Sequence, residues 1–216
     1  VVLNMLCFFE GLNLTSPINA SLIMITTPLI VYIISCYFSP KERQISRLIG
    51  VLLGLLGAAL LITDGRMLNL KTINIGDLLV FINAVSYAIY LILIKSMMQK
   101  YHPIIVLRTL FLIGFIIVFP IGWSDFLEVD FHAMPKDIIC KTLFVVLFTT
   151  CFAYFLNIYA ISNLTSSSVA FYIYLQPAIA TLIAVFFDKD IITDVSVLSA
   201  ILIFIGVYFV IKTKPI

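Results

Sequence analysis

Polar side chains recur at helical spacing inside four otherwise apolar segments of the chain. Residues three, four or seven positions apart share one face of a helix, so each set predicts a polar stripe along a helix. The members are Asn19 and Thr26; Asn83, Tyr87 and Tyr90; Tyr154 and Asn157; and Tyr172 and Gln176. Thr27 joins them because the internal repeat described below places it on Gln176. Their amides and hydroxyls donate and accept hydrogen bonds without charge. As a set they predict a cavity that binds a small organic solute, although each one alone would also serve to bond a neighbouring helix.

Residue patterns that support catalysis or metal binding are not found in the sequence. His102 and His132 are isolated, and the four cysteines (Cys7, Cys36, Cys140 and Cys151) form no CxxC pair. We therefore expect no metal site, no disulfide framework, no cofactor and no enzymatic activity. Glu10 lies in an apolar segment, where it would bind substrate or a proton, or else reach the lipid headgroups.

The composition shows what kind of elements must hold these side chains. Of 216 residues, 62% are hydrophobic and 11% are charged, and the mean hydropathy is +1.18. A soluble domain carries about 25% charged residues, so a water-soluble globular protein is excluded. A membrane-spanning helix needs about 20 apolar residues. Seven segments qualify, namely 17–38, 46–63, 77–98, 104–123, 138–161, 166–187 and 195–211, and residues 1–12 are apolar but too short. The predicted fold is an all-α, multipass membrane bundle.

The distribution of charge predicts the orientation of these spans. If the loop after residue 38 is cytoplasmic, that side holds eight of the thirteen basic residues: Lys41, Arg43, Arg47, Lys95, Lys100, Arg108, Lys212 and Lys214. Nine of the eleven acidic residues fall on the other side. Because Lys and Arg gather on the cytoplasmic side, we expect a cell-membrane protein with a cytoplasmic C-terminus. The near balance of 13 basic and 11 acidic residues argues against a nucleic-acid partner.

An internal repeat relates residues 17–63 to residues 166–211. A shift of 149 residues places Pro28 on Pro177 and Gly57 on Gly206. The two copies begin five spans apart, so they must cross the membrane in opposite directions, as inverted repeats of secondary transporters do. The prolines are expected to kink their helices. Gly50, Gly54 and Gly57 form a small-residue face that would let another helix approach closely.

These same segments resemble a known family. The stretch Gly11–Ala20, followed by Pro28, Phe38, Lys41-Glu42 and the glycines after residue 49, is similar to the EamA-like family of the drug/metabolite transporter superfamily. The resemblance implies ten helices in two inverted halves, with the present chain lacking the first two helices and part of the third. It divides the chain into residues 1–63 of the first repeat, a linker at 64–76, and a second repeat at 77–216. The second copy departs from the pattern at Ile191, which aligns with Glu42.

The resemblance implies a permease or exporter of small organic metabolites, such as amino acids or drugs, that works by alternating access. Its expected partners are that solute and the lipid bilayer, and a homo-oligomer is left open. Two other interpretations are a seven-helix receptor and a membrane-embedded enzyme. A retinal-type receptor would need a lysine in mid-membrane, and an enzyme would need clustered His, Asp or Glu near the membrane surface; the sequence offers neither.

Overall fold

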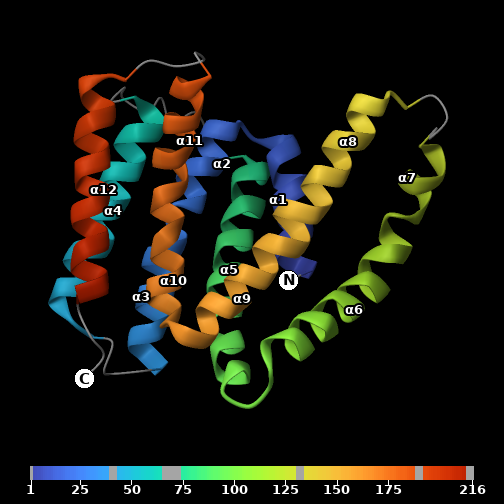
Figure 1. Cartoon of the computed structure of the whole chain (residues 1–216), viewed down its shortest axis with the longest axis horizontal. Helices are drawn as coiled ribbons and strands as arrows, with labels where there is room; N and C mark the ends of the chain where they lie inside the picture. The colour runs from blue at the N-terminus through green and yellow to red at the C-terminus, as the bar shows by residue number, and fades with distance from the viewer. Residues whose placement is uncertain (1, 39–42, 65–73, 130–133, 188–191, 213–216) are drawn as a thin grey trace. The chain divides into compact units, whose positions relative to one another are not determined.

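The computed structural model describes residues 2–38, 43–64, 74–129, 134–187 and 192–212, and every element in these ranges is helical (Figure 1). The elements are α1 (Val2–Leu14), α2 (Pro17–Met24), α3 (Thr27–Phe38), α4 (Ile45–Thr63), α5 (Ile75–Met98), α6 (Pro103–Ile121), α7 (Trp123–Glu128), α8 (Lys136–Phe144), the π-helical η2 (Val145–Phe152), α9 (Ala153–Asn163), α10 (Ser166–Phe171), the 3₁₀-helical η3 (Tyr172–Tyr174), α11 (Leu175–Phe186) and α12 (Asp194–Lys212).

Seven helical segments of the described residues are long and apolar enough to cross a membrane. They are Pro17–Phe38, Ile45–Thr63, Ile75–Met98, Pro103–Ile121, Lys136–Asn163, Ser166–Phe186 and Asp194–Lys212. Each end lies within two residues of the limit predicted from the sequence, and the first segment of the chain forms the shorter helix α1. The prediction of a multipass helical membrane protein is confirmed.

The chain folds into two compact units. The larger unit comprises Leu3–Ile92 and Thr165–Ile216, and the smaller unit comprises Val1–Val2 and Leu93–Leu164. The larger unit therefore holds α1 to α4, most of α5, and α10 to α12. These two units are defined by which residues lie close together in space, so they do not test the division of the sequence into two repeats. The boundaries of the repeats at residues 63 and 77 stay a prediction.

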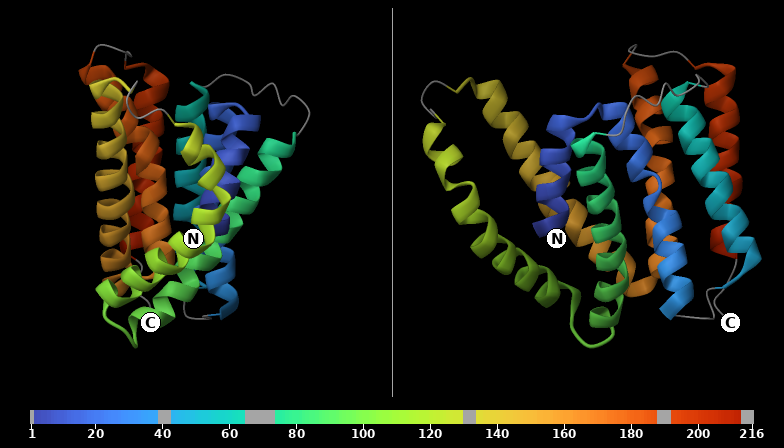
Figure 2. Two further views of the ribbon diagram at one scale, coloured as in Figure 1. Left: turned by 90° about the vertical axis from the view of Figure 1, so that its right-hand side faces the viewer. Right: turned by 180° about the vertical axis from the view of Figure 1, so that it is seen from behind.

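In the larger unit α4 and α12 lie side by side (Figures 1 and 2). Their backbones come unusually close at Gly206, where a Cβ atom would lie 2.6 Å from the carbonyl oxygen of Gly50 and 2.9 Å from the amide nitrogen of Gly54. Both distances are shorter than real Cβ contacts. The glycines thus allow contact between two backbones, as small residues commonly do between membrane helices.

The same contact occurs a second time with the two helices exchanged. A Cβ atom at Gly57 would lie 2.8 Å from the carbonyl oxygen of Ser199 and 3.0 Å from the amide nitrogen of Ile203. The shift of 149 residues maps each of these atoms onto its equivalent in the contact at Gly206. A contact that is preserved when its partners are exchanged is two-fold symmetric. The geometry therefore supports the inverted repeat that the sequence predicts.

The helix ends of the two copies also match. α4 and α12 each have 19 residues, and their first and last residues are related by the shift of 149 residues. The N-caps match as well, because Ser16 Oγ accepts a hydrogen bond from the Asn19 amide at 3.1 Å, and Thr165 Oγ1 accepts one from the Ser168 amide at 3.2 Å. Capping side chains satisfy amides that have no partner in the first turn of a helix. The repeat thus sets where α2 and α10 begin.

Both copies interrupt the first helix close to its proline. α2 ends at Met24 and α3 begins at Thr27, so Pro28 is the second residue of the new helix. In the other copy η3 separates α10 from α11, and Pro177 is the third residue of α11. A proline in the first turn removes no helical hydrogen bond, because those amides have no partner within the helix. Each helix therefore stops and restarts where the sequence suggested a kink.

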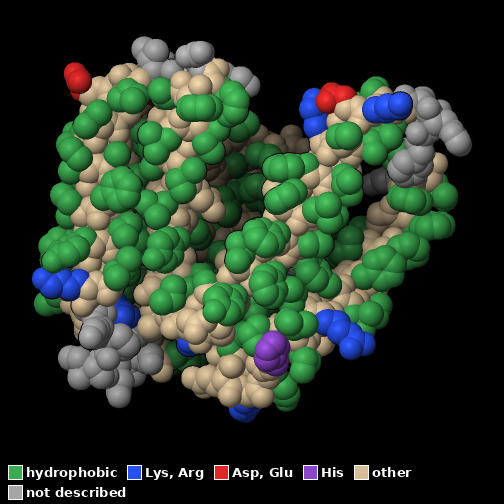
Figure 3. All heavy atoms as spheres, in the orientation of Figure 1, with side chains coloured by type: hydrophobic (Ala, Val, Ile, Leu, Met, Phe, Trp, Pro, Cys, Tyr) green, Lys and Arg blue, Asp and Glu red, His purple; other side chains and the backbone are tan. Residues whose placement is uncertain are grey.

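The outer faces are apolar and the charges lie near helix ends. Hydrophobic side chains cover the face of the larger unit formed by α11 and α12 (Figure 3). α12 begins at Asp194 and ends at Lys212. In the smaller unit aromatic rings contact one another along α6, where the ring centres of Phe115 and Phe119 are 5.1 Å apart. On α8 and η2 the rings of Phe144 and Phe148 stack with their centres 4.8 Å apart. Such faces suit a lipid environment.

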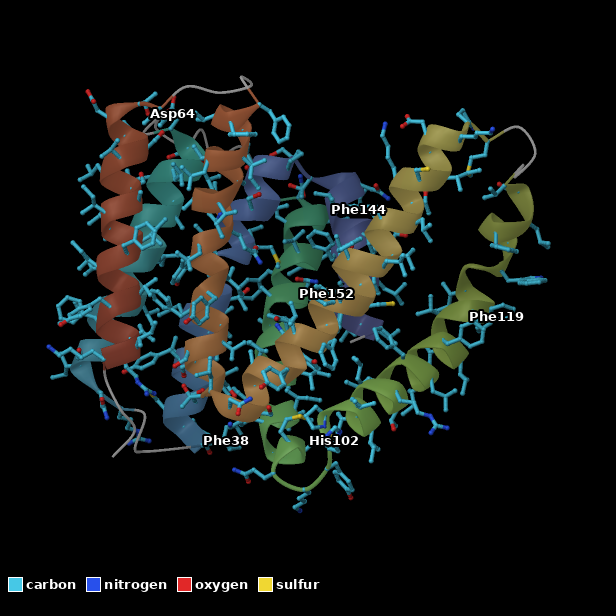
Figure 4. The ribbon with its side chains drawn as sticks, viewed as in Figure 1. Phe38, Asp64, His102, Phe119, Phe144 and Phe152 are labelled. Carbon is cyan, nitrogen blue, oxygen red and sulfur yellow. The ribbon has the colours of Figure 1, made fainter. Side chains whose placement is uncertain are left out.

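Several residues used in the sequence argument lie outside the described residues. They are Lys41, Glu42, Arg66, Lys71, Asp130, His132, Asp188, Lys189, Asp190, Ile191 and Lys214. Within the larger unit, Asp64 marks one end of α4 and Phe38 ends α3 near the start of α4 (Figure 4). The predicted orientation of these ends relative to the membrane stays a prediction.

Candidate functional site

A groove of about 420 Å³ opens in the larger unit between α2 and α11, with further walls from α1 and α4. Its volume falls in the usual range for small-molecule sites. The groove is lined by Phe8, Leu12, Pro17, Ala20, Ser21, Met24, Ile25, Ile62, Ile173, Gln176, Pro177 and Ala180. Ten of these twelve side chains are apolar. The groove is therefore an apolar surface with two uncharged polar groups.

Gln176 is the main polar side chain of the groove. It lies in the first turn of α11, immediately before Pro177, and it is exposed. Its amide can donate two hydrogen bonds and accept others. The second polar group, the Ser21 hydroxyl, donates its hydrogen to the Pro17 carbonyl oxygen at 2.8 Å, so only its lone pairs remain for a ligand. Gln176 thus offers most of the side-chain hydrogen-bonding capacity of this groove.

The other predicted residues of the first repeat, and Tyr172 of η3, are not among the residues that line the groove. Asn19 interacts with the carboxyl group of Asp77. Thr26 donates its hydroxyl hydrogen to the Ile23 carbonyl oxygen at 2.6 Å. Thr27 is fully buried, and Tyr172, in the turn before Gln176, is 44% exposed.

The predicted polar residues of α5 take part in hydrogen bonds and ring contacts within the larger unit. Asn83 is 2% exposed, and its side-chain amide donates to the Asn4 carbonyl oxygen at 2.6 Å. Asn4 returns a hydrogen bond from its own side-chain amide to the Asn83 carbonyl oxygen at 3.2 Å. The rings of Tyr87 and Tyr90 stack with their centres 5.8 Å apart. Asn83 thus joins α5 to α1, which is the bonding role that the sequence left open for such residues.

Three other predicted residues are placed as follows. Tyr154 and Asn157 belong to the smaller unit, where the Tyr154 ring contacts Phe111 of α6 at a centre distance of 5.7 Å. Asn157 is half-buried on α9. Glu10 is an exposed residue of α1 and is not among the groove residues.

Comparisons with known proteins agree with this architecture. The model of the EamA-like transporter family matches residues 1–63 and 74–212. The chain belongs to the EamA-like transporter family. The resemblance noted in the sequence is thereby confirmed.

This EamA-like protein is similar to proteins that are named as transporters. An "Uncharacterized transporter YyaM" of Bacillus subtilis (strain 168) is 26% identical over 93% of the chain and 66% of its own length. An "Uncharacterized transporter" of Archaeoglobus fulgidus is 28% identical over 93% of the chain and 68% of its own length. The chain thus spans about two thirds of these relatives. A crystal structure of a protein that is 15% identical superposes with a TM-score of 0.77 over 99% of the chain and 73% of its own length, which shows that the two share a fold.

The structure of this EamA-like protein also shows polar residues that the sequence analysis did not select. Thr15 donates its hydroxyl hydrogen to the Asp77 carboxylate, and Asp77 and Asn74 exchange hydrogen bonds between side chain and backbone amide at 2.8 and 3.1 Å. These bonds cap α5 and tie it to the turn after α1. The spacing of Asn74 and Asp77, an N-cap residue followed by an acid three positions later, is a capping-box signal that would have identified them.

Proposed function

We propose that this EamA-like protein is a membrane transporter that moves a small organic solute by alternating access, with the groove as its substrate site. The observation that carries the proposal is the position of the groove between α2 and α11, which belong to the two inverted repeats. Secondary transporters with inverted repeats bind substrate near the membrane midplane, between the repeats.

The lining of the groove supports an amphipathic substrate. Ten apolar side chains favour an aliphatic or aromatic body, and Gln176 offers an amide to a single polar group of the solute. No charged side chain lines the groove, whose residues are all described, so nothing in it compensates a fully ionised solute. We propose export across the cell membrane of uncharged or zwitterionic metabolites, amino acids or drugs. Tyr172 would extend the binding surface towards η3.

Direct binding to the purified, full-length protein tests the assignment of the groove. The probes are phenylalanine, tryptophan and an uncharged hydrophobic fluorophore, and the readouts are the dissociation constant and uptake into proteoliposomes. The variant Gln176→Leu keeps the size of the side chain but removes its hydrogen bonds. It should weaken binding of a recognised probe by about 1–3 kcal/mol, which is about fivefold to 150-fold.

Gln99→Leu is the matched control, because Gln99 is exposed after α5 and lies outside the groove. It should leave binding and uptake unchanged. Equal affinity of the parent and both variants for a transported probe would show that the groove is not the substrate site. Binding without uptake of any probe by the parent protein would instead count against transport.

A further inference from the structure

A second groove, with a volume of about 530 Å³, lies along α5 within the larger unit. It is lined by Leu3 of α1 and, from α5, by Leu78, Phe81, Ile82, Val85, Ser86 and Ile89. None of these residues lines the groove between α2 and α11. The members from α5 recur at intervals of three and four residues, so they share one face of the helix. This strip is called the α5 groove below.

The α5 groove is apolar, and its side chains are exposed. Leu3 is 58% exposed, Leu78 is 53% exposed and Phe81 is 47% exposed, and Ser86 is the one polar side chain among the lining residues. The helix belongs to the membrane-spanning segment Ile75–Met98, so its outer face meets lipid rather than water. The surface that the α5 groove presents is therefore suited to an acyl chain.

The length of the α5 groove matches one lipid leaflet. From Leu78 to Ile89 it follows about three turns of helix, which is roughly 16 Å. Half of a hydrocarbon core of about 30 Å is about 15 Å. Leu78 lies in the first turn of α5, where the span begins, so that end of the α5 groove is at the membrane surface. The other end lies near the middle of the bilayer.

The helix α1 forms a side wall at the surface end of the α5 groove (Figures 1 and 2). A Cβ atom at Gly11 would lie 2.8 Å from Cγ2 of Val80, and Asn4 exchanges hydrogen bonds with Asn83. An earlier residue of α1 thus meets a later residue of α5, so the two helices are antiparallel. The last turns of α1 therefore lie beside the first turns of α5.

Glu10 belongs to this end of α1. It is seven positions after Leu3, so the two residues share one face of α1. Glu10 is exposed, and it forms no hydrogen bond or ion pair with the part of the chain that the structure describes. A carboxylate at the edge of the hydrocarbon is unfavourable unless a cation or hydrogen-bond donor meets it. The α5 groove thus ends beside a carboxylate that a cationic head group would neutralise.

We propose that the α5 groove binds a phospholipid with a primary-amine head group, with one acyl chain along α5 and the ammonium group at Glu10. A primary ammonium donates hydrogen bonds to a carboxylate, whereas the trimethylammonium group of phosphatidylcholine has no hydrogen to donate. An anionic head group would be repelled by Glu10. This inference goes beyond the proposed function, because the lipid supports the packing of α1 on α5 and is not the transported solute.

Native mass spectrometry of the full-length protein in detergent tests the head-group preference. The probes are phosphatidylethanolamine, phosphatidylcholine and phosphatidylglycerol with identical acyl chains. The parent should bind phosphatidylethanolamine about threefold to fivefold more tightly than the other two, which is the upper range for an exposed ion pair. Glu10→Gln should remove this preference over phosphatidylcholine. Glu128→Gln, which alters an exposed acid outside the α5 groove, should keep it. Equal affinities in the parent, or a preference that survives Glu10→Gln, would overturn the proposal.

A variant that fills the α5 groove tests the position of the acyl chain. Val85→Trp should weaken binding of both phosphatidylethanolamine and phosphatidylcholine by at least about fivefold. The control Ile201→Trp adds the same ring to a half-exposed position on α12 and should leave both affinities unchanged. Unchanged lipid binding by Val85→Trp would overturn the assignment.

A cysteine at Ile82, in a background without native cysteines, tests the alternative of a protein interface. A disulfide-linked dimer through this cysteine would assign the α5 groove to a second copy of the chain and overturn the lipid site. If Val85→Trp does not fold, Glu10→Gln still decides, because its position is exposed. Loss of the lipid with retained binding of a solute probe would leave the proposed function standing.

Discussion

The contact between α4 and α12 allows a quantitative test of the repeat, through the substitutions Gly206→Ala and Gly57→Ala. At Gly206 the new methyl carbon would lie 2.6 Å from the Gly50 carbonyl oxygen, whereas ordinary contacts begin at 3.4 Å. The helices must therefore separate by roughly 0.8 Å, since the atom in the way belongs to the backbone and cannot rotate aside. A gap of that size loses about a quarter to a half of the attractive energy of each dispersion contact across the interface.

The expected loss of stability follows from two opposing contributions. Overfilling a tight contact costs about 1–3 kcal/mol, and a rigid backbone obstacle favours the upper end of that range. Alanine stabilises a helix by about 1 kcal/mol relative to glycine, which offsets part of that cost. We expect each variant to lose about 2 kcal/mol of unfolding free energy. Because the two contacts involve equivalent atoms, Gly57→Ala and Gly206→Ala should cost nearly the same, although they lie in different repeats.

The double variant provides the sharper result. Either substitution alone already forces the helices apart, so the second adds little, and the pair should cost at least about 1 kcal/mol less than the sum of the singles. The assay is reversible unfolding in mixed SDS micelles, followed by helical circular dichroism. Gly114→Ala is the control, because its nearest atom would be 3.8 Å away, and it should be neutral or stabilising. Additive costs, or a Gly206→Ala variant as stable as Gly114→Ala, would refute the symmetric contact.

Three further predictions concern orientation and stability. In intact cells, with native cysteines replaced, an impermeant thiol reagent should label a cysteine at Asn13 but not one at Gln44; labelling at both would contradict the predicted topology. Asn83→Leu should lower the unfolding free energy by about 0.6–1.7 kcal/mol, from lost bonds to α1, and leave probe affinity unchanged; weaker binding at unchanged stability would assign it to the site instead. Lys95 donates to the Ile161 carbonyl oxygen at 2.8 Å. Lys95→Met should therefore speed amide hydrogen exchange at the end of α9, and unchanged protection there would show that this bond adds no stability.

The spans, the repeat and the family were all evident in the sequence. Spans of apolar residues bounded by charges can be read directly, because backbone groups in lipid must be satisfied within one helix. The repeat could be read for a similar reason, since Pro28 and Pro177 and the glycines at positions 57 and 206 have few substitutes where two backbones meet or a helix restarts. These properties depend on local chemistry and spacing.

The sequence did not distinguish the residues that line the groove from those that bond to a neighbouring helix. Helical spacing places Asn83 and Gln176 equally well on polar stripes, yet Asn83 bonds to α1 while Gln176 lines the groove. Spacing shows which residues share a face of a helix, but it does not show which neighbour meets that face. That depends on contacts between residues far apart in the chain, and these form only in the folded bundle.

Thr27 and Gln176 show the same limit most clearly. The sequence relates them by the repeat and predicts similar surroundings for both. The tertiary structure buries Thr27 between packed helices and leaves Gln176 exposed in the groove. A repeat determines which helices correspond, but two repeat-related surfaces of one bundle can be packed differently, because each is formed by contacts between residues far apart in the chain. Which side is open is therefore decided by the packing of whole helices, and no local sequence pattern encodes it.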